Sequence, residues 1–146
     1  MTTQSAPTPA PARRMRSDEE LEHLLVWLPT SGLARRYRPK HPYMIGVRNA
    51  VEWVLGRQRT SPVTCRHGDE RPDGTAVYSE QLTAHEGMAC GPRQIREDYR
   101  LGDDETDVFG LDYFTAVENT LGWVLGWDSF GLRFEDSWPW PTQFDQ

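Results

Sequence analysis

The sequence predicts a mainly α fold, a small helical bundle with two related tryptophan-bearing helices and an irregular middle segment. Three observations lead to this prediction. Apolar residues recur at a spacing of three and four in the stretches 17–28, 42–55 and 112–125. The second and third stretches resemble each other in sequence. The segment between them is rich in Pro, Gly and charge, which favours loops.

The first predicted helix begins at Ser17, because its hydroxyl and the Glu20 carboxylate have the spacing of a capping box. Pro29 and Gly32 end the helix. Its apolar stripe consists of leucines at helical spacing, namely Leu21, Leu24, Leu25 and Leu28.

The other two strong helices end in the same way. Pro42 suits the first turn of a helix that continues to Leu55 and stops at Gly56, a favourable C-terminal cap. The third strong helix covers 112–125 and is closed by Gly126. Both helices are therefore expected to end at a C-terminal glycine.

The middle of the chain is less regular. Residues 58–78 are expected to form a loop with room for short strands near Pro62–Cys65 and Thr75–Tyr78. Ser79–Ala89 and Pro92–Leu101 are weaker helix candidates, since neither has a clean apolar stripe.

An internal repeat relates residues 43–56 to residues 113–126, which are identical at seven of fourteen positions with an offset of 70. Val47 and Val117 mark the apolar face of each helix. The opposite faces carry Asn49 and Trp53 in one copy, and Asn119 and Trp123 in the other.

Each repeat helix thus has two faces that favour burial. One hypothesis is that Trp53 and Trp123 are core residues, with Asn49 and Asn119 bonded to neighbouring backbone groups. The other is that these four residues form a paired surface for a partner or a second copy of the chain.

We expect three segments along the chain. Residues 1–16, rich in proline, form a tail that is disordered alone or ordered by a partner. Residues 17–136 form one domain. Residues 137–146 form an aromatic and proline-rich tail, which either binds a partner or covers the core of the chain itself. The candidate binding residues of this tail are Trp138, Trp140 and Phe144.

Charge is distributed unevenly. Residues 1–72 hold 12 basic and 7 acidic side chains, whereas residues 73–146 hold 4 basic and 15 acidic ones, within a net charge of −6. One interpretation is that the halves fold against each other and their charges pair or solvate each other. The other is that each half faces a different partner.

The densest basic cluster supports an alternative function, a regulator that binds nucleic acid. Arginines on a turn between two helices can contact phosphates, although the acidic half would repel the same backbone. The cluster consists of Arg35, Arg36, Arg38 and Lys40, with Arg57 and Arg59 beyond the next helix.

A second alternative is a small zinc-stabilised protein or enzyme. Cys65, His67, His85 and Cys90 are the ligand types of a tetrahedral zinc site, but their spacing and order are unusual for one. The favoured expectation is therefore free thiols and no metal.

No enzyme motif is present. Nucleophile elbow, phosphate loop, dinucleotide fingerprint and metalloprotease helix are all absent, so we expect a protein that is not an enzyme and needs no cofactor. No apolar run is long enough for a membrane span, so no membrane partner is expected.

Fifteen of the sixteen basic residues are arginine, and Asn and Ile each occur twice, which indicates a high-GC bacterial genome or its phage or plasmid. The favoured function is a non-enzymatic protein-protein interaction protein, an accessory or structural subunit of a larger assembly. It would act in the cytoplasm, or in the virion if phage-encoded, with a protein partner or as a homo-oligomer.

Overall fold

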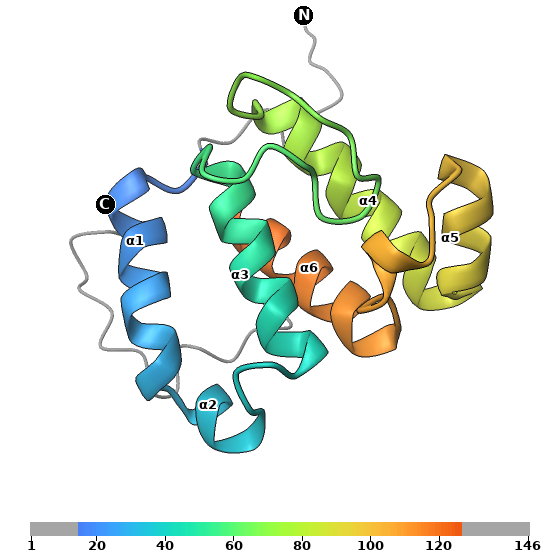
Figure 1. Ribbon diagram of the computed structural model, residues 1–146. Helices are drawn as coiled ribbons and strands as arrows, with labels where there is room; N and C mark the ends of the chain where they lie inside the picture. The colour runs from blue at the N-terminus through green and yellow to red at the C-terminus, as the bar shows by residue number, and fades with distance from the viewer. Residues whose placement is uncertain (1–14, 127–146) are drawn as a thin grey trace, which may run out of the picture.

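The computed structural model describes residues 15–126, and every regular element in that range is a helix (Figure 1). The mainly α fold is therefore confirmed. The elements in chain order are α1 (Asp18–Trp27), η1 (Leu28–Thr30), α2 (Gly32–Arg36), α3 (Pro42–Val54), α4 (Gly74–Cys90), α5 (Pro92–Tyr99), η2 (Asp104–Thr106) and α6 (Leu111–Val124).

The three strong helices form where the sequence predicts them, as α1, α3 and α6. Ser17 caps α1 as expected, since its hydroxyl accepts from the Glu20 amide at 3.2 Å and the Glu20 carboxylate accepts from the Ser17 amide at 2.9 Å. Gly56 and Gly126 close α3 and α6 with φ of +82° and +84°, a conformation that favours glycine.

The middle of the chain differs from the prediction. The prediction of short strands near Pro62–Cys65 and Thr75–Tyr78 is wrong. Residues 62–64 form a turn, and residues 75–78 belong to α4, because the Asp73 carboxylate accepts from the Ala76 amide at 2.8 Å and starts the helix there. In the described residues, β pairing is limited to an isolated bridge between Thr60 and His67.

The helices are arranged around α6. It lies between α3 and α4, while α1 stands on the outer side of α3 and α5 lies at the far end of α4 (Figure 1). Gly87 of α4 permits the close approach to α6, because a Cβ there would lie 2.8 Å from the Phe114 ring.

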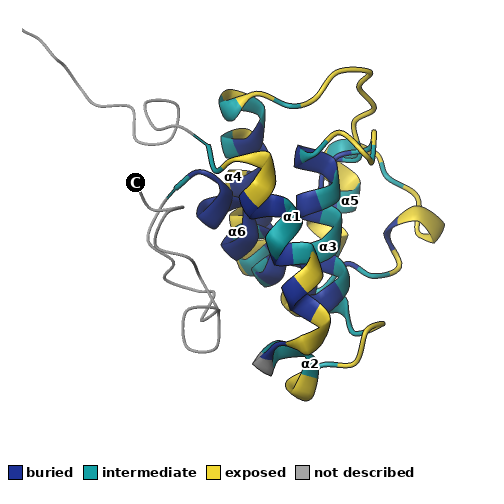
Figure 2. Ribbon diagram, turned by 90° about the vertical axis from the view of Figure 1, so that its left-hand side faces the viewer, coloured by how far each residue is buried: buried dark blue, intermediate teal, exposed yellow. Residues whose placement is uncertain are grey.

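The core is built mainly by α1, α3 and α6, whose buried positions are dark blue in Figure 2. It combines aromatic rings with a larger number of aliphatic side chains. The largest fully buried side chains are Tyr113, Phe114, Leu21, Leu24, Leu28, Ile95, Leu121, Leu125, Val47, Val51 and Val54.

Among the helices of residues 15–126, none combines the length and the apolar character that crossing a bilayer requires.

Candidate functional site

The two predicted asparagines of the repeat helices bridge α3 and α6. Asn49 donates from Nδ2 to the Tyr113 hydroxyl at 3.2 Å, and Asn119 donates from Nδ2 to the Tyr43 hydroxyl at 3.4 Å. The two bonds join matching positions of the resembling segments. The amides therefore bond to tyrosine hydroxyls of the other helix, and not to neighbouring backbone groups as one hypothesis expected.

The two helices approach closely between these bonds. A Cβ on Gly46 would lie 2.8 Å from the Cβ of Ala116 and 3.0 Å from the Tyr113 carbonyl oxygen. Glycine permits this crossing because it places no side chain between the two backbones.

Trp53 and Trp123 are buried, with 8% and 6% of their surface exposed. The Arg16 guanidinium lies 4.5 Å from the Trp123 ring centroid, and its Nε donates to the Trp123 carbonyl at 2.7 Å. Both tryptophan side chains are thus packed inside the fold of a single chain. A role for these residues in binding another molecule stays a prediction.

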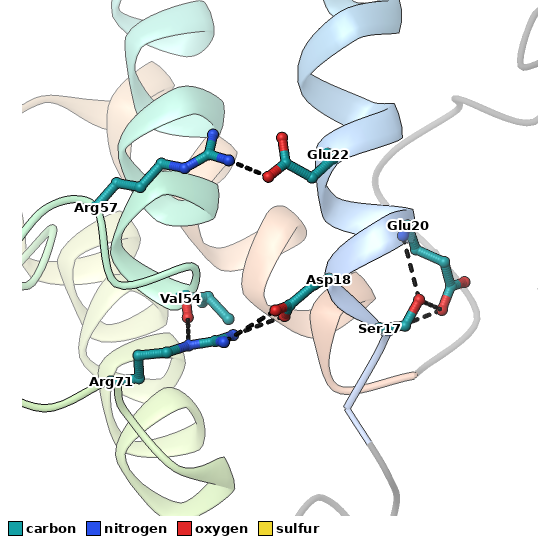
Figure 3. Close-up of polar contacts among 7 residues, drawn as sticks. All are labelled: Ser17, Asp18, Glu20, Glu22, Val54, Arg57 and Arg71. Atoms are coloured by element: carbon teal, nitrogen blue, oxygen red, sulfur yellow. Dashed lines mark hydrogen bonds and ion pairs between the residues drawn. The ribbon is translucent and has the colours of Figure 1, made fainter.

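A set of polar contacts fastens α1 to the rest of the fold (Figure 3). Arg71 donates two hydrogen bonds to the Asp18 carboxylate, at 3.0 and 2.8 Å, and its Nε donates to the Val54 carbonyl at the end of α3, at 3.1 Å. Arg57 pairs with Glu22 of α1. The bond to Arg71 lowers the pKa of the Asp18 carboxyl below its ordinary value.

The predicted arginine cluster divides into two groups. Arg57 pairs with Glu22, and Arg59 lies 3.7 Å from Asp69, so both have a carboxylate partner inside the chain. The other four cluster residues are exposed, and none forms an ion pair within residues 15–126. We call these four the basic corner: Arg35, Arg36, Arg38 and Lys40.

A ring stack and two hydrogen bonds hold the residues next to the basic corner in place. Tyr37 stacks on Tyr43 at a centroid distance of 5.0 Å, which joins the corner to the first turn of α3. His41 caps α3 by accepting from the Tyr43 amide at 3.1 Å, and Arg48 donates to the Pro39 carbonyl at 2.7 Å. Figure 2 shows exposed ribbon at α2.

Few charged contacts join the two halves of the chain. Among residues 15–126, the contact between the His41 ring and the Asp112 carboxylate, at 3.7 Å, is the one charged-group contact that joins residues 1–72 to the acidic half. In the described residues the two halves fold against each other, since α3 packs on α6, but nearly every charged pair is formed within one half, so charge pairing between the halves is rare there.

A cleft of about 200 Å³ lies between the loop at 59–70 and α4, with Trp53 and Tyr99 in its wall. Its buried carboxylate, Glu80, is occupied by the loop: it accepts from the Thr64 amide and hydroxyl, both at 2.8 Å, and from the Val63 amide. Glu80 therefore anchors the loop, and its oxygens are not free to act as a general base.

The four predicted zinc ligands have separate surroundings. The Cys65 thiol is half-buried and donates to the Val63 carbonyl at 3.7 Å, whereas His67 lies 3.3 Å from the Thr60 hydroxyl. Burial raises the pKa of the Cys65 thiol to about 11, which disfavours the thiolate that zinc requires.

His85 faces Glu118 at 3.8 Å, and the exposed Cys90 donates to the Gly91 carbonyl at 3.7 Å. No group of three or more His, Cys, Asp or Glu side chains in the described part of the chain is arranged to hold a metal ion. The structure does not bring the predicted ligand set together.

Two residues with structural importance escaped the sequence analysis. Arg71 lies in a charged loop and Glu80 lies on a helix without a clean stripe, so neither carried a recognisable pattern. Of the predicted tail residues, Trp138, Trp140 and Phe144 lie outside the described residues.

No protein-family model matches the chain, and comparison with curated proteins and with solved structures returns no match. The functional argument therefore rests on the residues of the chain itself.

Proposed function

We propose that this chain is a non-enzymatic interaction protein, an accessory or structural subunit that docks on an acidic surface of a protein partner through the basic corner. The proposal includes the cytoplasmic or virion location and the phage or plasmid origin, which rest on composition alone.

The observation that carries the proposal is the contrast among the arginines. Arg57 and Arg71 are engaged by carboxylates of α1, whereas the basic corner extends four cations into solvent without a counter-charge among the described residues. Like charges close together repel one another, and nothing in the described residues reduces the repulsion among these four cations. An acidic partner would reduce it.

Nucleic acid is the second candidate, and the same four side chains favour it, because guanidinium groups bind phosphates well. Sequence-specific readout by α3 is disfavoured, since α3 packs against α6 and stacks through Tyr43 on Tyr37. The exposed cations of the basic corner would then mainly contact the phosphate backbone.

The experiment compares two probes on the full-length protein: a fluorescent poly-glutamate peptide and a duplex DNA of equal net charge. The test variant carries Arg35→Gln, Arg36→Gln, Arg38→Gln and Lys40→Gln. The control carries Arg93→Gln and Arg100→Gln, two other exposed arginines. We expect the wild type and the control to bind the peptide, and the test variant to lose most of that affinity.

Tighter DNA binding that falls steeply with salt would favour the nucleic-acid candidate instead. Peptide binding that the test variant retains would overturn the assignment of the basic corner.

A further inference from the structure

We propose that the acidic, aromatic segment 127–146 docks on the basic corner of the same chain through Glu135 and Asp136. The inference concerns the surface named in the proposed function, but it needs no external partner and is tested on the protein alone.

The first argument is charge complementarity. Residues 127–146 contain four acidic side chains and one basic side chain, Arg133, whereas the basic corner contains four cations and no acid. Glu135 and Asp136 are adjacent, so together they offer the double negative charge that best matches a cluster of arginines.

The second argument is where the segment leaves the fold. Gly126 closes α6 next to the start of α1, because the Val124 carbonyl accepts from the Arg16 amide at 2.9 Å and the Trp123 carbonyl accepts from the Arg16 side chain at 2.7 Å. From that point α1 runs to η1 and α2, which carry the chain to the basic corner (Figure 1). α1 thus forms a direct path from the exit of the segment to the corner.

The third argument is reach. The ten residues of α1 are about 15 Å long, the three residues of η1 add about 6 Å and the five residues of α2 about 8 Å. Glu135 lies nine positions after Gly126, so an extended chain spans up to about 30 Å. Asp128, two residues beyond Gly126, reaches only about 7 Å and cannot approach the corner.

The outer face of α1 offers contacts along this path. Val26 is 74% exposed, the largest value among the exposed apolar side chains of residues 15–126, and it can contact an aromatic ring such as Phe134.

The covalent link favours docking within one chain over docking between two chains. A short tether gives the segment an effective concentration in the millimolar range, above the concentration of a second copy in dilute solution. The segment would then compete with an external acidic partner for the same cations.

The test measures the contact by NMR on the full-length protein. A nitroxide is attached through Ser137→Cys in a chain with Cys65→Ser and Cys90→Ser, and amide intensities are recorded. We expect strong loss of intensity for residues 33–41. Adding Glu135→Lys and Asp136→Lys should restore it, whereas the matched control Asp128→Lys should not.

Two further measurements sharpen this result. In about 1 M salt, where the Debye length is about 3 Å, the intensity loss should disappear. Without any label or cysteine replacement, the amide shifts of residues 33–41 should differ between the wild type and the Glu135→Lys and Asp136→Lys variant.

The inference is overturned if residues 33–41 keep their intensity and their shifts in every sample, or if the intensity loss survives the charge reversal. Intensity loss in an isotope-labelled, nitroxide-free chain mixed with a nitroxide-bearing chain would assign the segment to a second copy. Because no acidic partner is present, these outcomes are independent of whether the external docking of the proposed function succeeds.

Discussion

Arg71 and Arg36 belong to the same basic half of the chain, but they relate to the fold in opposite ways. Arg71 donates to Asp18 and to the Val54 carbonyl, and so joins α1 to the end of α3. Arg36 is exposed and has no carboxylate partner in the described residues. Arginine charge thus stabilises the fold at one place, and under the proposed function it binds an acidic partner at the other.

The largest loss of stability is expected where the fold depends on burial rather than charge, at the buried tryptophans of α3 and α6. Trp123→Ala and Trp53→Ala should each lower the free energy of unfolding by roughly 3–5 kcal/mol, the range for emptying a large aromatic site. Trp53 should lie at the lower end, since it lines the open cleft. Denaturant midpoints close to wild type would contradict the burial of these side chains.

The next effect concerns the close crossing at Gly46. Gly46→Ala should destabilise by about 1–3 kcal/mol, because the new Cβ would overlap that of Ala116, which cannot move aside. Adding Ala116→Gly should restore most of the loss. Gly74→Ala is the matched control, since nothing lies within 4 Å of a Cβ there. Equal unfolding curves for Gly46→Ala and the control would refute the close approach.

Arg71→Ala should have a smaller effect, about 1 kcal/mol, because it removes an exposed ion pair and one hydrogen bond to a carbonyl. Arg59→Ala removes the more exposed pair with Asp69 and should leave stability nearly unchanged. Chemical denaturation of the two variants checks the difference. An equal loss of unfolding free energy in both would show that the hydrogen bond from Arg71 to the Val54 carbonyl contributes nothing.

The Asp18 carboxyl gives the same contact a pH dependence. Since the folded pKa of Asp18 is lowered, the contribution is present above the ordinary value of 3.8 and is lost as pH falls through the folded pKa. Unfolding measured from neutral to strongly acidic pH should therefore show a larger loss in the wild type than in Arg71→Ala. Parallel pH profiles would count against the Asp18 contact.

Much of the fold was predictable from local patterns. The capping box at Ser17 and the terminal glycines Gly56 and Gly126 mark helices that the structure contains. The start of α4 was not predictable in the same way, because its buried residues include Glu80 and Gln81, which obscure the apolar stripe.

The candidate site was predictable in composition but not in arrangement. The sequence identified Arg57 and Arg59 with the basic corner as one cluster. Their separation depends on Glu22, which is 35 residues from Arg57, and on the loop that carries Asp69. Contacts at such separations depend on the packing of helices, and no local pattern in the sequence reports them.

The most direct test of the central claim follows the binding site itself. An unlabelled poly-glutamate peptide is titrated into the isotope-labelled full-length protein, and amide shifts are recorded, with the four-glutamine variant of the basic corner as the reference. We expect the shifts to concentrate at residues 33–41 in the wild type and to vanish in the variant, whose melting temperature should stay near wild type. Shifts concentrated at the cleft of residues 59–70, or unchanged in the variant, would contradict the claim that the basic corner is the binding surface.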